Sequence, residues 1–162
     1  MAKFDIAFKN MIKTLLEEGE RKTDRTGTGT ISYPGMTFRH DMRDGFPQVT
    51  FRKAPFKAAA VELEGFIKGI TSKKWYEERG CYYWSAWCSP QKVKYGHDEE
   101  TKKRMRQEDD LGLIYGAQGR DFHCPGYIRS RGVDQFKVLI DTLKNDPSSR
   151  RMVVSYWNPL AL

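Results

Sequence analysis

Three stretches of the chain repeat apolar residues at the three-to-four-residue spacing of an α-helix. They run from Phe4 to Leu16, from Phe56 to Ile70 and from Val133 to Leu143. Each predicted helix therefore has one apolar face, and such a face must pack against another element. Short segments rich in β-branched and aromatic residues also occur, and they predict strands at ISYPGMTFRHDM, FPQVTFRK and RMVVSYW.

Composition and charge narrow the class of protein. Hydrophobic residues make up 39% and charged residues 30% of the chain, which predicts a globular, soluble protein. The N-terminus lacks a signal-peptide core, and no apolar run has the length of a membrane span. The cysteines are odd in number and, like the histidines, lack metal-ligand spacing, so we expect a reduced, cytoplasmic protein without a metal. A net charge of +7 favours an anionic partner, either a nucleic acid or a phosphorylated small molecule.

Two segments combine arginine with features of an anion site. DRTGTGT places Arg25 beside glycines that let the backbone approach a ligand, and a guanidinium matches phosphate by paired hydrogen bonds. Arg150 and Arg151 are adjacent just after a predicted helix, where their charges repel unless an anion lies between them. An exposed loop arginine and ordinary surface ion pairs are the alternatives for these two segments.

A helix carboxylate and an aromatic segment are further candidates for a site. Glu62 and Glu64 lie on opposite flanks of the apolar stripe that begins at Phe56, so one of them can look into a site at the helix edge. Four aromatic residues follow at Tyr82, Tyr83, Trp84 and Trp87. They form either a stacking wall for a flat heterocycle or part of the core. Residues 91 to 110 are polar on every face and predict a solvated excursion.

Seven segments, in the same order and at similar separations, resemble motifs of the thymidylate synthase family. They are DRTGTGT at 24–30, DGFPQVT at 44–50, VELEGFIKG at 61–69, W-x-x-W at 84–87, LGLIYGAQGR at 111–120, VDQ at 133–135 and NDPSSRRMVVSYWNP at 145–159. The ordered set covers nearly the whole chain apart from residues 88 to 110. The resemblance implies an α+β fold, in which a large twisted mixed β-sheet packs against helices on one face and against a second subunit on the other.

The resemblance also implies a reaction. The complete enzyme would transfer a one-carbon unit from 5,10-methylenetetrahydrofolate to C5 of dUMP and reduce it to methyl, giving dTMP, with folate as cosubstrate and reductant. The family's nucleophilic cysteine adds to C6 of the pyrimidine. In the family this cysteine follows the Trp157-Asn158-Pro159 segment, and this sequence stops at Leu162. We therefore expect residues 1–162 to form a single partial domain, truncated on its C-terminal side and inactive alone.

Individual roles follow from the positions that match. Arg25 matches a phosphate-binding arginine, Glu62 a glutamate that organises water and proton transfer near the pyrimidine carbonyl, and Tyr115 a tyrosine near the C5 proton. Positions that line the folate and nucleotide cavity are matched by Arg52, Tyr83, Trp84 and Trp87. Arg150 and Arg151 match a pair that reaches the phosphate of the neighbouring subunit, which implies a homodimer with arginines contributed in trans.

Some residues depart from the family pattern. Gly65 stands in place of an aromatic residue, Ser85 in place of an acidic one, and Ala117 and Gly119 in place of larger ones. Because these positions surround the folate side, a dUMP or dCMP hydroxymethylase of the same superfamily stays open, in which water captures the intermediate. A non-catalytic nucleotide- or RNA-binding remnant is the other alternative. A steep loss of oligonucleotide affinity with salt would indicate nucleic-acid binding.

Overall fold

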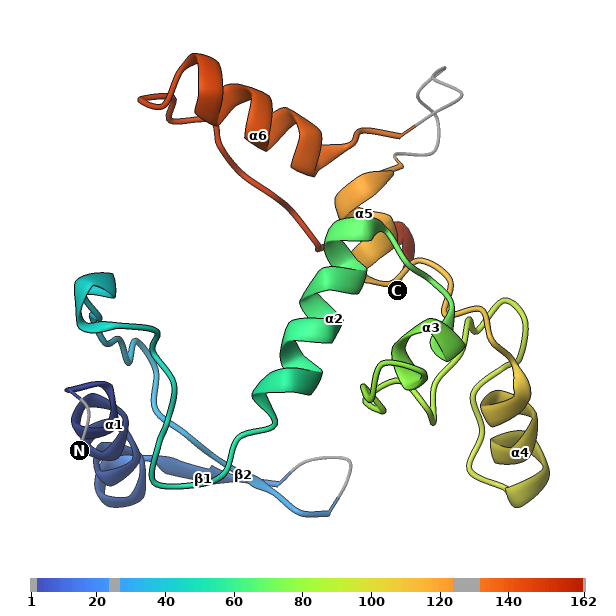
Figure 1. Cartoon of the computed structure of the whole chain (residues 1–162). Helices are drawn as coiled ribbons and strands as arrows, with labels where there is room; N and C mark the ends of the chain where they lie inside the picture. Colours follow the sequence, from blue (N-terminus) through green and yellow to red (C-terminus); the bar gives the residue numbers. More distant parts are fainter. Residues whose placement is uncertain (1–2, 24–26, 124–131, 162) are drawn as a thin grey trace. The chain divides into compact units, whose positions relative to one another are not determined.

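The computed structural model describes residues 3–23, 27–123 and 132–161 (Figure 1). The chain divides into two compact units, Met1–Pro55 and Phe56–Leu162. Among the described helices, none has the length and apolar character needed to cross a membrane.

The first unit is a helix with a short hairpin. Helix α1 spans Lys3–Glu18, and strands β1 (Glu20–Lys22) and β2 (Thr30–Ser32) pair antiparallel, followed by the 3-10 turn η1 at Met42–Asp44. The predicted first helix is thereby confirmed. Its Asp5 is buried and accepts hydrogen bonds from the Thr50 amide at 2.8 Å and the Thr50 hydroxyl at 2.6 Å. This carboxylate ties the loop after η1 back to α1.

The second unit is helical. Its elements are α2 (Phe56–Lys68), α3 (Lys73–Glu77), α4 (Glu99–Gln107), α5 (Tyr115–Arg120), α6 (Gln135–Asn145) and the 3-10 turn η2 (Pro159–Ala161). Helix α2 packs against α5 and α3, and α5 also packs against α6 (Figure 1). Tyr76, Cys81 and Leu111 are fully buried at the centre of this packing. The predicted helices from Phe56 and toward Leu143 are therefore confirmed.

Most of the predicted strand content is not found. Residues 30–32 pair with β1, whereas 46–53 and 151–157 take no strand conformation. A strand needs a neighbour to satisfy its backbone N–H and C=O groups. Within the described ranges nothing pairs with these two segments, so their alternating pattern alone does not make a ladder. The described residues thus contain helices and one small antiparallel sheet.

Helix α2 buries a different face from the one predicted. Phe56, Leu63 and Ile67 on the predicted stripe are about half exposed, at 52%, 54% and 47%. The buried face instead carries Gly65, where an added Cβ would stand 2.2 Å from Cε1 of Tyr76. Because Gly65 has no side chain, the Tyr76 ring packs directly on the helix backbone and sets which face turns inward.

Part of the polar stretch 91–110 is folded onto the second unit. Helix α4 begins after Asp98, whose carboxylate accepts a hydrogen bond from the Thr101 amide. Val93 and Met105 are buried together with Cys88, while most of the charged residues stay exposed. The polar pattern missed this small core because the two apolar residues lie twelve positions apart in the sequence.

Candidate active site

Glu62 lies in the middle of α2, next to the face that packs on Tyr76. Its Oε1 accepts a hydrogen bond from the indole Nε1 of Trp84 at 2.9 Å. Burial raises the pKa of the Glu62 carboxyl, and the hydrogen bond from Trp84 offsets part of that rise. The net pKa is raised, so this carboxyl keeps its proton to a higher pH than an ordinary glutamate. A carboxyl whose pKa is raised by partial burial is a candidate for proton transfer.

Trp84 belongs to a group of aromatic rings that pack edge to face. Tyr115, the first residue of α5, has its ring centroid 6.1 Å from that of Trp84 and 5.6 Å from that of Tyr156. Phe66 of α2 lies 5.2 Å from Tyr115 and 6.2 Å from Trp84. These contacts hold the hydrogen-bond partner of Glu62 beside Tyr115.

A pocket of about 260 Å³ opens beside these rings. Aromatic side chains of Trp84, Tyr115, Tyr156 and Trp157 line it, together with the amides of Gln118 and Asn158. Apolar and aromatic walls with a few fixed polar groups are typical of small-molecule sites. The pocket therefore suits a flat heterocycle with hydrogen-bonding edges.

Buried amides connect the two walls of this pocket. Nδ2 of Asn158 donates to Oε1 of Gln118 at 3.1 Å, and Nε2 of Gln118 donates to the Leu113 carbonyl at 3.1 Å. From α6, Gln135 donates to the carbonyls of Gln118 and Ser155 and accepts from the Ser155 amide. The network fixes α5 relative to residues 155–158.

Sequence reasoning did not single out Gln118, Tyr156 or Asn158 as site residues. They lie within the matched motifs LGLIYGAQGR and NDPSSRRMVVSYWNP, and this membership is the signal that could have found them. Neutral amides carry no charge and no ligand spacing, so residue chemistry alone gave no reason to select Gln118 and Asn158.

Of the predicted aromatic wall, Trp84 lines the pocket, where it meets Tyr115, which was predicted separately as a residue near the C5 proton. Tyr83 and Trp87 are exposed at 43% and 49% and do not line it. The Trp87 ring pairs instead with Tyr95, at 5.7 Å between centroids. The predicted cavity roles of Tyr83 and Trp87 thus find no geometric support in this pocket.

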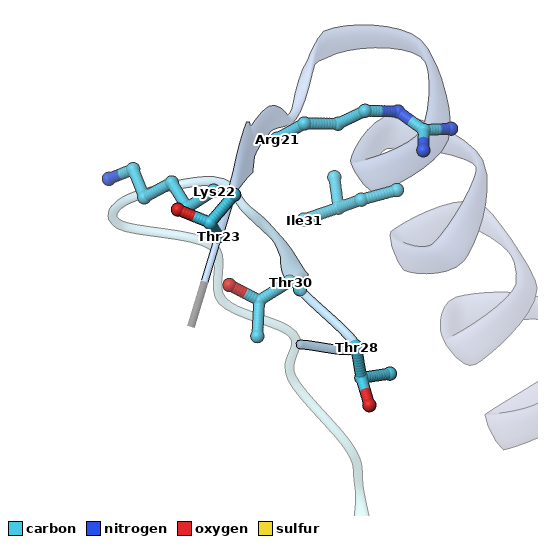
Figure 2. Close-up of a pocket in the computed structure, with 7 residues that line it drawn as sticks. Arg21, Lys22, Thr23, Thr28, Thr30 and Ile31 are labelled. Atoms are coloured by element: carbon cyan, nitrogen blue, oxygen red, sulfur yellow. The ribbon is translucent and has the colours of Figure 1, made fainter. Parts of the chain in front are cut away.

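A second, more open pocket of about 410 Å³ lies on the β1–β2 hairpin of the first unit (Figure 2). Because opposed residues share a face, Lys22 stands with Thr30 and Arg21 with Ile31. Figure 2 shows the Lys22 and Arg21 side chains pointing to opposite sides. Exposed cations and threonine hydroxyls give this hairpin a basic, hydrogen-bonding surface.

Four arginines were predicted to belong to the site: Arg25, Arg150 and Arg151 to bind phosphate, and Arg52 to line the cavity. Arg25 lies outside the described residues. Arg150 and Arg151 are exposed in the turn after α6, and Arg52 is exposed in the first unit. Within the described ranges, no carboxylate forms an ion pair with Arg150 or Arg151. These guanidiniums are therefore accessible to an anion.

No metal site emerges from the described part of the chain, where no three His, Cys, Asp or Glu residues gather in one place.

A comparison with known protein families identifies the family of the chain. The family model for thymidylate synthase matches residues 6–162, which is nearly the whole chain. The match includes α2 with Glu62, the segment with Trp84, α5 with Tyr115 and the segment with Asn158. The chain belongs to the thymidylate synthase family.

Proposed function

We propose that the aromatic pocket is part of a site for the reductive methylation of dUMP to dTMP with 5,10-methylenetetrahydrofolate. The hydrogen bond between Glu62 and Trp84 carries this proposal, because Trp84 and Tyr115 together line the pocket. A carboxyl with a raised pKa can organise water and relay a proton at a pyrimidine carbonyl. The surrounding rings can stack on a pyrimidine or a pterin.

Tyr115 and a cysteine supplement Glu62 in this proposal. Tyr115 acts near the C5 proton, and the family's cysteine adds to C6 so that C5 can attack the one-carbon unit of the folate. Burial raises the pKa of the Cys81 and Cys88 thiols, so neither is a ready thiolate nucleophile. Cys124, the third cysteine, lies outside the described residues, and none of the three matches the family's nucleophile position, so we expect the polypeptide 1–162 alone to form no dTMP.

The basic residues complete the proposal. Arg25 binds the nucleotide phosphate of its own subunit, while Arg150 and Arg151 reach the phosphate bound by the neighbouring subunit of a homodimer. The large twisted sheet of the family fold would lie at that dimer interface. The exposure of both adjacent guanidiniums and the net charge of +7 support an anionic substrate. We place the protein in the cytoplasm.

The test uses a chimaera in which the cysteine-bearing segment of a thymidylate synthase follows Leu162. The purified chimaera is incubated with dUMP and 5,10-methylenetetrahydrofolate, and nucleotide and folate products are separated by chromatography. Formation of dTMP with dihydrofolate is the expected result. A 5-hydroxymethyl nucleotide would instead indicate the hydroxymethylase alternative. Absence of product, with an oligonucleotide affinity that falls steeply with salt, would favour the non-catalytic alternative.

A further inference from the structure

Lys73 carries a charge that is buried away from the candidate site. It is the first residue of α3 and is 3% exposed. Its Nζ donates to the main-chain carbonyls of Met105 at 2.9 Å and Trp87 at 3.1 Å. Removing an ammonium from water is costly, and charge-assisted hydrogen bonds offset that cost only while both carbonyls stay in place. The buried charge therefore favours one arrangement of these two carbonyls.

The Trp87 carbonyl belongs to the last residue of a turn that begins at Trp84. The Trp87 amide donates to the Trp84 carbonyl at 2.9 Å, which closes the turn between the two tryptophans. The indole of Trp84 then donates to Glu62. Three hydrogen bonds, joined through the covalent structure of Trp87 and Trp84, thus link the Lys73 ammonium to the Glu62 carboxyl. The Met105 carbonyl extends the path to the last turn of α4.

Other contacts anchor the segment around residue 109 without the ammonium. The Lys73 amide donates to the Asp109 carbonyl, and the Asp109 carboxylate accepts from the Ser72 hydroxyl and the Lys74 amide. Loss of the Lys73 side chain would leave these bonds intact. Loss of the Lys73 side chain should therefore disturb the Trp84–Trp87 turn, while the segment around Asp109 stays attached to α3.

We propose that Lys73 is a positioning residue: its ammonium fixes the Trp84–Trp87 turn, and through it the indole that hydrogen-bonds to Glu62. This role rests on the function proposed for Glu62, but it concerns geometry that can be measured without turnover. The two carbonyls to which the Lys73 ammonium donates belong to Trp87 and Met105, neither of which lines the pocket, so we expect Lys73 to act through Trp84.

The protonation of Glu62 can be followed at the indole of Trp84. Tyr76 of α3 and Cys81 of the following turn are titratable groups that interact electrostatically with Glu62. Burial raises the pKa of Tyr76 to about 12 and raises that of the Cys81 thiol, so both stay neutral while a glutamate titrates. A pH-dependent signal at the Trp84 indole in acidic solution therefore reports on Glu62.

The experiment follows the indole N–H resonances of the ¹⁵N-labelled 162-residue chain as pH is varied. Trp84→Phe identifies the Trp84 signal among the four tryptophans. In the unchanged chain the Trp84 signal should shift with pH, and Glu62→Gln should abolish the shift. In Lys73→Met, which keeps the length but not the donors, the shift should fall at least about twofold as the hydrogen bond loosens. Lys73→Arg should restore part of it.

Matched controls separate positioning from general destabilisation. Lys74→Met removes the exposed neighbouring charge and should leave the shift unchanged. Val93→Ala weakens the core beside α4 without touching the ammonium, and should also preserve the shift in folded protein. Should Lys73→Met fail to fold by circular dichroism, Lys73→Gln replaces it and should show the same reduction.

Three results would overturn the proposal. They are an undiminished shift in the folded Lys73 variant, an equal loss in Val93→Ala, and a Trp84 shift that is insensitive to Glu62→Gln. None of these results depends on whether the chimaera makes dTMP, so a failure of the proposed function is distinguishable from a failure of this inference.

Discussion

Glu62 and Glu64 stand two residues apart in α2 and meet opposite environments. Glu64 is exposed and pairs with Lys68 one helical turn away, which lowers the pKa of its carboxyl. Glu62 is partly buried, and its hydrogen-bond partner is an indole rather than a cation. The same side chain is therefore a solvated ion at one position and a proton-binding group at the other.

The raised pKa of Glu62 predicts how stability changes with pH. A carboxyl that binds its proton more tightly in the folded state contributes stability that is fully present below the unfolded pKa. That contribution is lost as pH rises through the folded pKa. The loss of stability begins near pH 4.5, the ordinary pKa of a glutamate, and continues as the pH rises above it. Glu62→Gln should remove this fall in the free energy of unfolding, measured by urea denaturation across the acidic to neutral range.

Glu64→Gln is the control for this prediction. The lowered pKa of Glu64 has the opposite sign, so its contribution is present above the unfolded pKa and lost as pH falls through the folded one. If Glu62→Gln keeps the pH dependence of the unchanged chain, burial does not raise the pKa of this carboxyl.

At the scale of the elements, aromatic rings fill the space beside two glycines that depart from the family pattern. The Tyr76 ring packs against Gly65 of α2, and the Phe136 ring of α6 packs against Gly119 of α5, where an added Cβ would stand 2.4 Å from Cε2. Each glycine therefore permits a close contact between two helices. These pairs set the positions of α2 and α5, which carry Glu62 and Tyr115.

Gly65→Ala should destabilise the second unit although alanine is the better helix former. The gain in helix propensity is about 1 kcal/mol, whereas a methyl group forced against the buried Tyr76 ring costs roughly 1–3 kcal/mol. Tyr76 cannot move freely, because its hydroxyl donates to the Ile70 carbonyl. Thermal unfolding would show the loss. Gly65→Ala combined with Tyr76→Phe should recover little, since the ring itself occupies the space.

Ala59→Ser, at an exposed position of the same helix, is the control and should change the free energy of unfolding by less than about 0.5 kcal/mol. A Gly65→Ala variant as stable as this control would mean that Tyr76 does not pack on α2 as described.

The helices could be predicted from the sequence because their apolar periodicity is local. Helices α1, α2 and α6 appear where their patterns place them. The strands could not be predicted in the same way, since residues 46–53 and 151–157 need partners that no local pattern specifies. The predicted inward face of α2 was also wrong. The packing of Tyr76 on Gly65 is a tertiary contact, and helical periodicity contains no information about it. The helical periodicity alone left both Glu62 and Glu64 as candidates, and only the resemblance to the family pointed to Glu62.

At the scale of the whole molecule, the proposed site draws on two subunits. Arg150 and Arg151 are exposed beyond the end of α6, and their repulsion is relieved when an anion binds between them. We expect each charge-assisted contact to a phosphate to contribute about 1.5–3 kcal/mol. In the chimaera, Arg151→Ala should therefore weaken dUMP binding roughly ten- to a hundred-fold.

Mixing subunits distinguishes a trans arrangement from a cis one. An Arg151→Ala subunit is combined with a subunit that lacks the nucleophilic cysteine, and subunit exchange is verified independently. In the heterodimer one site loses both features and the other keeps both. At dUMP concentrations too low to saturate the Arg151→Ala parent, the mixture should therefore be more active than either parent. A mixture no more active than its parents after verified exchange would show that these arginines do not act across the interface.

The central claim is that Glu62 works as a proton-handling group in a nucleotide-methylating site, and one comparison tests it most directly. Turnover of dUMP is measured in the chimaera carrying either Glu62→Gln or Glu64→Gln, with thermal unfolding of both. The account predicts that Glu62→Gln lowers turnover roughly a hundredfold or more while the protein stays folded. It also predicts that Glu64→Gln leaves turnover within about twofold. Turnover of Glu62→Gln within a few-fold of the unchanged chimaera would contradict the account.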